Sequence, residues 1–271
     1  MRTLKITLAY VGTAYVGWQR QARGVSIQGL VEEVLTRIDG APVTVHGAGR
    51  TDAGVHAIGQ VASARVSTRL DAPTLRRALN AMLPPDVRVA AVEDEAPGFH
   101  ARYDAVGKTY EYRIWQGDVQ PPFVRAWSWH IPRHLDVAAM DEAARAIEGT
   151  HDFTVFQSRR GSVRTAVRTV TSARVRAAEP RHATAADPLQ WWASGPDSRA
   201  WLVVTVEANG FLRHMVRAIV GTLVEVGNGR REAGSMAALL DSRDRVASGP
   251  TAPAHGLILV HVAYPPPSAA R

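Results

Sequence analysis

One segment of the chain combines residue types and spacing that suit covalent or acid–base chemistry. It connects two predicted strands and reads HGAGRTDAGVHA, from His46 to Ala57. Its single carboxylate is Asp52, two residues after Arg50, on a backbone whose glycines allow tight turns and close approach. The functional interpretation is one catalytic carboxylate in a rigid loop, kept ionised by nearby positive charge. The alternative, which spacing alone favours, is a turn aspartate that caps nearby backbone amides.

The sequence predicts neither a nucleotide-cofactor site in this segment nor a metal site. A Gly-x-Gly pair after a strand is typical of dinucleotide binding, but the third glycine of that pattern would fall at Asp52, where an acid repels pyrophosphate. The segment also has no P-loop lysine. No histidine has the spacing of a zinc site, so we predict no metal and interpret these side chains as structural: His46, His56, His100, His130 and His134.

The composition is that of a soluble globular protein with a polyanionic partner. The 271 residues are 46% hydrophobic and 21% charged, which excludes a disordered chain, and the absence of cysteine excludes disulfides, thiolate metal sites and cysteine nucleophiles. The net charge is +7, and only Lys5 and Lys108 among the 32 basic residues are lysine. A GC-rich genome explains the preference for arginine, but the excess of positive charge indicates nucleic acid.

Neither end of the chain predicts a membrane segment. Residues 1–10 alternate apolar and polar side chains, whereas a signal peptide needs an unbroken apolar run. The charge-free stretch 246–270 is interrupted by five prolines, so it cannot span a membrane. We expect a soluble protein of the cytoplasm.

Apolar periodicity predicts two successive split β-α-β units and therefore an α+β fold. The first half has the order strand, helix, strand, strand, helix, strand, with Ser26 and Asp71 as helix caps, at residues 1–10, 27–38, 43–46, 58–66, 71–83 and 87–92. The second half repeats that order loosely, at residues 110–115, 127–131, 136–148, 168–176, 200–208, 211–226, 235–241 and 257–264. We place the domain boundary so that residues 1–105 and 106–271 form the two domains.

The predicted helix 211–226 has one apolar face, with Arg217 at its margin. An arginine there can run its stem along the core and present its guanidinium to a buried acid. A solvated position on the exposed face fits Arg213 better. The apolar face consists of Leu212, Met215, Val216, Ile219, Val220 and Leu223.

Six ordered motifs carry a family resemblance over nearly the whole chain. The most specific is GRTDAGVHA, which strongly resembles the signature of the tRNA pseudouridine synthases of the TruA family. The others follow in that family's order: YVGTAYVGWQRQ (Tyr10–Gln21), FHARYDAVGKTYEY (Phe99–Tyr112), DFTVF (Asp152–Phe156), NGFLRHMVRAIVGTLVEVG (Asn209–Gly227) and AHGLILVHVAYP (Ala254–Pro265).

The resemblance implies an activity, a fold and a partner. The activity is isomerisation of uridine to pseudouridine at positions 38, 39 and 40, in and beside the anticodon loop of tRNA, without a cofactor. The fold is two ferredoxin-like domains that form one extended antiparallel sheet. The family also implies a homodimer that binds one tRNA across both subunits.

The resemblance assigns roles to individual residues as well. Asp52 is implied to be the catalytic carboxylate, whether it attacks C1′, attacks C6 or takes a 2′ proton, and Arg217 is implied to pair with it. Tyr110 is implied to stack on the uracil and to accept the C5 proton, although a strand tyrosine that faces the core is the alternative, which fits Tyr112 better. Leu257 matches an apolar residue beside the base. Arg50 stands next to the carboxylate, where the flipped nucleotide or a phosphate would pass.

RNA binding is expected to rest on arginines and aromatic residues together. The candidates are Trp18, Arg20, Arg23, Arg159, Arg160 and Arg213, and the alternative for each charged residue is a solvated surface. Two other functions would use the same residues. A non-catalytic RNA-binding module or chaperone would keep Asp52 only as a turn residue, and a nucleosidase would release free uracil.

Overall fold

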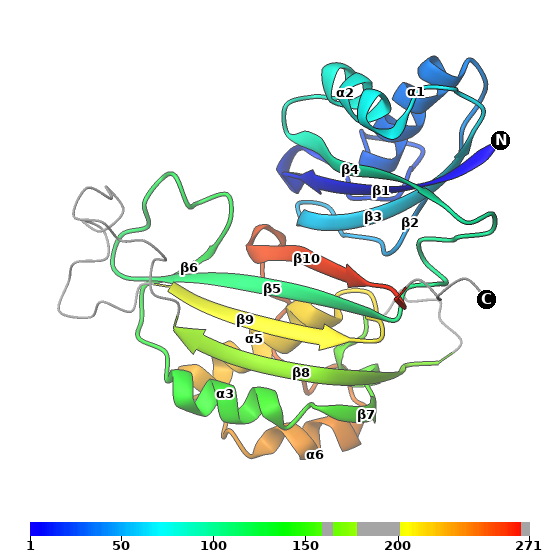
Figure 1. Ribbon diagram of the computed structural model, residues 1–271. Helices are drawn as coiled ribbons and strands as arrows, with labels where there is room; N and C mark the ends of the chain where they lie inside the picture. The colour runs from blue at the N-terminus through cyan, green and yellow to red at the C-terminus, as the bar shows by residue number, and fades with distance from the viewer. Residues whose placement is uncertain (159–164, 178–200, 267–271) are drawn as a thin grey trace. The chain divides into compact units, whose positions relative to one another are not determined.

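The chain forms two compact units, each described here by itself. The structure is a computed structural model and describes residues 1–158, 165–177 and 201–266 (Figure 1). The first unit is Met1–Lys108 with the chain from Ile258 onward, and the second is Thr109–Leu257. Among these described residues no helix is both long and apolar enough to cross a membrane.

The first unit is a sheet whose central strand is β1. Strands β4 (Val87–Glu95) and β3 (His56–Val66) pair antiparallel with either side of β1 (Arg2–Tyr10). The other edge of β3 is shared: β2 (Val45–Gly47) pairs with its second half and β10 (Leu257–Ala263) runs parallel to its first two residues. The predicted order strand, helix, strand, strand, helix, strand is thus confirmed.

Two helices cover one face of this sheet (Figure 1). The helix α1 (Ile27–Asp39) begins at Ser26, whose hydroxyl accepts the Gly29 N–H, and α2 (Ala72–Met82) begins at Asp71, whose carboxylate accepts the Thr74 N–H. Both caps were predicted from the sequence. Each helix buries an apolar stripe, as the 3.6-residue period requires: Ile27, Val31, Val34 and Leu35 on α1, and Leu75 and Leu79 on α2.

The second unit is a sheet with helices on one face. Strand neighbours follow the order β5 (Gly107–Gln116), β9 (Trp201–Ala208), β8 (Val167–Ala177) and β7 (Gly149–Asp152), and β6 (Trp129–Ile131) runs parallel to β5. The helices α3 (Val137–Arg145), α5 (Met215–Gly227) and α6 (Ser235–Ser242) lie on one side of it (Figure 1). The predicted α+β class is therefore confirmed, with mostly antiparallel pairing. Short 3₁₀ turns are η1 (Gly12–Ala14), η2 (Thr154–Phe156) and η3 (Ala254–Gly256).

Three details differ from the sequence predictions or lie outside the described residues. The helix predicted from residue 211 begins only at Met215, because His214 has left-handed backbone angles (φ 63°, ψ 3°) that no α-helix accommodates. Strand β7 was not predicted. The composition of residues 177–199, rich in alanine, proline, aspartate and serine, predicts a surface loop, and this segment lies outside the described residues after Ala177. The division after residue 105 stays a prediction, and it assigns to the C-terminal domain the strand β10 that pairs with β3.

The helix α5 is buried on nearly every side and is locked to the segment 249–252. Pro250 O lies so near the helix that a Cβ added to Gly221 would be 1.6 Å from it. At the next residue of the helix, the Gly249 N–H donates to Thr222 Oγ1 at 2.9 Å. The Ala252 N–H donates to Arg217 O at 3.0 Å. Small residues on α5 therefore allow a backbone segment to lie directly on the helix.

We expect Gly221→Ala to destabilise the protein by about 1–3 kcal/mol, because the added methyl group overlaps a backbone carbonyl that cannot turn away. Urea unfolding followed by circular dichroism measures this loss. The matched control is Gly234→Ala, since Gly234 has an ordinary φ of −66° and open space around its Cβ position. Equal unfolding midpoints for the two variants would contradict the close contact.

Candidate active site

In the first unit, Asp52 lies on a tight turn between β2 and β3, in a loop of residues 48–55 that we call the Asp52 loop. The Val55 N–H donates to Asp52 O at 3.1 Å, and Gly54 takes a φ of 78°, as the third residue of a type II turn does. A backbone hydrogen bond thus closes the turn on which Asp52 stands. Asp52 is half-buried and Arg50 is exposed.

Buried polar side chains hold the Asp52 loop from beneath. Tyr10 Oη shares a 2.9 Å hydrogen bond with Thr51 Oγ1, and Gln60 Nε2 donates to Gly49 O at 3.0 Å and to Tyr10 Oη at 3.3 Å. Burial raises the pKa of Tyr10 to about 12, so its hydroxyl stays protonated at neutral pH. His56 Nδ1 accepts the Gly12 N–H at 3.0 Å, which places the ring proton of a neutral His56 on Nε2.

Trp18 is part of this support. Its ring is 2% exposed and lies so close to Gly47 that a Cβ there would be 2.3 Å from it. Its backbone N–H donates to Thr51 O at 3.1 Å, and its carbonyl accepts the Gln28 N–H in α1. This burial argues against the direct contact with RNA that the sequence predicted for Trp18, because a ring in the core has no face open to a base.

We expect Tyr10→Phe to lower both the free energy of unfolding and the catalytic turnover per folded molecule. Loss of one buried hydroxyl leaves Thr51 and Gln60 with poorer partners, at a cost of about 1–2 kcal/mol, and loosens the backbone next to Asp52. Turnover per folded molecule and urea unfolding are the two measurements. Tyr264→Phe is the control, since it also removes a tyrosine hydrogen bond, to Ala101 O at 2.7 Å, without touching the Asp52 loop. If both variants kept wild-type turnover, the supporting role of Tyr10 would be wrong.

In the second unit, Tyr110 and Tyr112 lie two residues apart on β5 and differ in their surroundings. Tyr110 is 6% exposed and meets Phe211 edge to face, with ring centroids 5.1 Å apart. Tyr112 is fully buried, its hydroxyl donates to Pro253 O at 2.8 Å, and burial raises its pKa far above the usual value. The core role predicted for Tyr112 is confirmed.

Arg217 is held in place by the segment that packs on α5. Its Nε donates to Ala252 O at 2.7 Å, and its own carbonyl accepts the Ala252 N–H. It is half-buried on a helix whose neighbouring residues are buried. Leu257 is 5% exposed at the start of β10, directly after the turn η3.

His255, in η3, is kept neutral by its surroundings. Desolvation is the main cause that lowers the pKa of His255, the positive charge of Arg217 acts in the same direction, and a hydrogen bond with the Ser128 backbone opposes both. Because the neutral form is preferred in the folded state, the unfolded chain binds more protons between the lowered folded pKa and the unfolded value. Stability that is present above about pH 6.5 is therefore lost as the pH falls toward the folded pKa.

We expect His255→Gln to flatten this pH dependence. Urea unfolding at pH 7.5 and pH 5.5 would show a smaller loss of stability on acidification in His255→Gln than in the wild type. His134→Gln is a control, because His134 is exposed and should leave the wild-type dependence in place. An equal loss in all three proteins would show that His255 does not titrate between these values.

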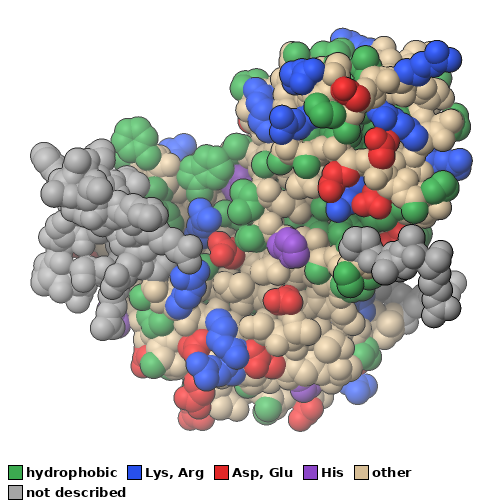
Figure 2. Space-filling model, in the orientation of Figure 1, with side chains coloured by type: hydrophobic (Ala, Val, Ile, Leu, Met, Phe, Trp, Pro, Cys, Tyr) green, Lys and Arg blue, Asp and Glu red, His purple; other side chains and the backbone are tan. Residues whose placement is uncertain are grey.

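The predicted RNA-binding arginines lie at different places. Arg20 is exposed and pairs with the buried Glu32 at 3.3 Å, so part of its charge is used in the fold, and Arg23 is exposed on the same loop. Arg213 is exposed just before α5. Arg159 and Arg160 lie outside the described residues. On the face drawn in Figure 2, by contrast, basic and acidic side chains around α3 lie side by side, as in the ion pair of Arg145 with Asp141.

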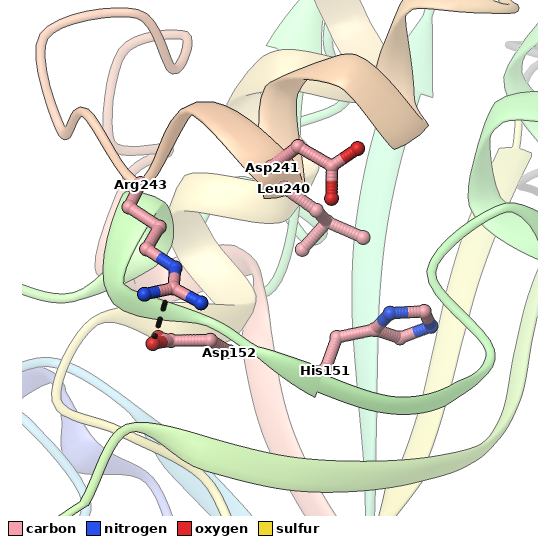
Figure 3. Close-up of a pocket in the computed structure, with 5 residues that line it drawn as sticks. All are labelled: His151, Asp152, Leu240, Asp241 and Arg243. Atoms are coloured by element: carbon pink, nitrogen blue, oxygen red, sulfur yellow. Dashed lines mark ion pairs between the residues drawn. The ribbon is translucent and has the colours of Figure 1, made fainter.

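A small cavity of about 270 Å³ in the second unit contains none of the predicted site residues (Figure 3). Asp152 points toward Arg243 there at 3.5 Å, whereas the His151 ring points away from both. Hydrogen bonds from the Thr154 side chain and backbone keep the pKa of Asp152 below its usual value. These contacts give Asp152 a structural role at the start of η2. In the described ranges, no group of three or more histidine or acidic side chains is placed to hold a metal ion.

A family model described as tRNA pseudouridine synthase matches residues 6–104 and 143–265. Enzymes of this class are isomerases. The match includes Asp52, Arg217 and Leu257, whereas Tyr110 lies between its two parts.

Curated relatives match over almost their whole length. A "tRNA pseudouridine synthase A" of Syntrophotalea carbinolica is 41% identical, covering 98% of each chain, and one of Geobacter sulfurreducens is 40% identical, covering 97% of this chain and 100% of that protein. The chain belongs to the tRNA pseudouridine synthase family and is an isomerase. A solved structure titled "Crystal Structure of a Cbf5-Nop10-Gar1 Complex" matches 82% of this chain and 45% of that chain, at 14% identity and a TM-score of 0.32.

Sequence analysis missed the residues that support the site. Tyr10 was counted as an alternating strand residue and Gln60 was not singled out, yet together they hold Gly49 and Thr51. The available signal was the polar Gln60 within the predicted strand 58–66, since a buried amide needs partners.

Proposed function

We propose that the enzyme converts uridine to pseudouridine at positions 38, 39 and 40 of tRNA, in and beside the anticodon loop. The observation that carries this proposal is the placement of Asp52. It is the only carboxylate of the segment that resembles the family signature, and it lies half-buried on a tight turn between β2 and β3. Family membership supports the reaction type, and the motif resemblance supports the three positions.

The proposed reaction exchanges one glycosidic bond for another. The N1–C1′ bond breaks, the uracil turns, C5 bonds to C1′, the C5 proton leaves and N1 gains a proton, so atoms and electrons balance without an oxidant or a cofactor. Asp52 starts the reaction by attack on C1′ or C6, or by removal of a 2′ proton. Its half-buried position leaves the carboxylate partly accessible, which each of these steps requires.

The remaining predicted residues are proposed to bind the uridine. Tyr110, whose ring meets Phe211 edge to face, is proposed on the resemblance to stack on the uracil, and its hydroxyl is the proposed acceptor of the C5 proton. Arg217, fixed through Ala252, is the proposed partner of the reacting carboxylate, and Leu257 is proposed to pack against the base. Arg50, exposed on the Asp52 loop, is proposed to guide the extruded nucleotide.

Contacts with the rest of the tRNA are proposed for the exposed arginines. These are Arg20, Arg23 and Arg213, and the same contacts are proposed from the sequence alone for Arg159 and Arg160, which lie outside the described residues. A homodimer and a cytoplasmic location are proposed on the resemblance alone, and light scattering after size-exclusion chromatography tests the first of them.

We expect Asp52→Ala to abolish tritium release from tRNA that carries 5-tritiated uridine, with a loss on the order of a thousandfold or more. Asp52→Asn, which keeps the shape and removes the charge, should be equally inactive. Asp94→Asn is the control, because Asp94 is an exposed carboxylate on β4 paired with Arg2. Nucleoside analysis of the product tRNA identifies pseudouridine and its positions.

Other results of this experiment would indicate a different function or mechanism. Free uracil in the product mixture would identify a nucleosidase. Tight tRNA binding without tritium release by the folded wild type would identify a non-catalytic RNA-binding module. Tritium release that persists in Asp52→Ala would leave the isomerase in place and remove Asp52 from its mechanism.

A further inference from the structure

A basic pocket of about 620 Å³ lies in the second unit, beside the beginning of α5. Of the residues predicted from the sequence, only Arg213 contributes to it. Its walls come from the residue before the first gap in the described chain, from the two residues that precede α5 and from the loop after α6. The lining consists of Ser158, Arg213, His214, Arg245, Val246, Ser248, Gly249, Pro250 and Thr251.

The lining is positive, without compensation from acids in the described part of its wall. It contains two arginines and one histidine and no aspartate or glutamate. Asp244 is adjacent in sequence but does not line the pocket, and its carboxylate accepts the Val246 N–H at 2.9 Å. The face around α3 is different, since basic and acidic side chains lie side by side there (Figure 2), and Arg145 of α3 pairs with Asp141. A concave surface with unbalanced positive charge concentrates anions.

Arg245 is fixed in a defined orientation by two hydroxyl groups of the pocket wall. Its guanidinium donates to Ser248 Oγ and, at 3.0 Å, to Thr251 Oγ1. These bonds use two of its five N–H donors, so within the described chain three remain for a ligand. An oriented guanidinium loses little side-chain entropy when it binds a phosphate and can donate two parallel hydrogen bonds to it.

The backbone before α5 places Arg213 and the helix end at the same pocket. His214 has the left-handed φ of 63°, unusual for a residue other than glycine, between the buried Leu212 and Met215. Burial of both neighbours holds that conformation and leaves Arg213 at the exposed rim. The N-terminus of the 13-residue helix α5 adds partial positive charge beside the same space.

The pocket is joined to a proposed substrate-binding residue by one short segment. Gly249, Pro250 and Thr251 form part of its wall, and the next residue, Ala252, exchanges two hydrogen bonds with Arg217. Because Pro250 lies directly on α5 and the Gly249 N–H is held by Thr222, this segment has little freedom to move. A ligand in the pocket is thus held in a fixed relation to Arg217.

We propose that this pocket binds a backbone phosphate of the tRNA, with Arg245 as the oriented donor in its wall and Arg213 as the second donor at its rim. The proposal rests on the proposed function, because it takes tRNA as the ligand. It adds a phosphate-binding position that fixes the RNA strand relative to Arg217. Such a contact positions the RNA and carries no base specificity.

The test is tRNA binding by filter retention at several salt concentrations. Arg213→Ala and Arg245→Ala should each raise Kd about tenfold near 0.1 M salt and reduce the slope of log Kd against log salt by about one. The matched control is Arg230→Ala, which removes the same charge from an exposed position just after the other end of α5 and should keep the wild-type slope.

Two further variants separate a phosphate contact from loop stability. Arg245→Lys should recover part of the affinity and the full salt slope, because it keeps the charge. The double substitution Ser248→Ala and Thr251→Ala removes the hydroxyls that orient Arg245 and should weaken binding without changing the slope. Circular dichroism confirms that each variant is folded.

The proposal is overturned if Arg213→Ala and Arg245→Ala keep the salt slope of the wild type and of Arg230→Ala. It is also overturned if inorganic phosphate alone raises the melting temperature of the wild type but not of Arg245→Ala while tRNA affinity is unaffected, since the pocket would then bind free phosphate. Failure of the proposed function looks different. The wild type would bind tRNA with the predicted dependence on both arginines yet release no tritium.

Discussion

The Asp52 loop depends on close packing of its backbone against residues that β1, η1 and the start of α1 supply. Gly12 is so close to Val55 that a Cβ would lie 1.9 Å from its carbonyl oxygen, and at Gly17 it would lie 2.5 Å from Thr51 O. Only glycine fits such contacts, and Gly17 also has a φ of 104°. The motif YVGTAYVGW is therefore a platform for the loop, which explains why two distant motifs belong together.

A similar constraint organises the second unit around α5. A buried helix needs partners on all sides, and here one partner is the irregular segment 249–252, which satisfies backbone groups through Thr222 and Arg217. The same hydrogen bonds that complete this segment also orient Arg217. Fold stability and the position of a proposed substrate-binding side chain thus rest on the same atoms, so sequence changes at either are expected to affect both.

The distribution of charge distinguishes surfaces that serve the fold from those that suit RNA. Around α3 and in the small cavity at β7, basic groups face acids, and Asp152 with Arg243 is one such pair. In the pocket before α5 the described lining has no acid to balance Arg213 and Arg245. The net charge of +7 indicates a binding surface for RNA only when paired and unbalanced basic groups are counted separately, because paired charges contribute little attraction to a polyanion.

The sequence by itself determined the class, the order of the elements and the candidate carboxylate, because apolar periodicity, helix caps such as Ser26 and Asp71, and short motifs are local properties. Tertiary structure decided what local patterns cannot encode. It placed Trp18 in the core, began α5 at Met215 after the left-handed His214, and brought Tyr10 and Gln60 beneath the Asp52 loop. It also joined Arg245, Ser248 and Thr251 to Arg213 in one pocket. Each of these outcomes depends on contacts between residues far apart in the chain, and such contacts are set by packing and burial rather than by neighbours in sequence.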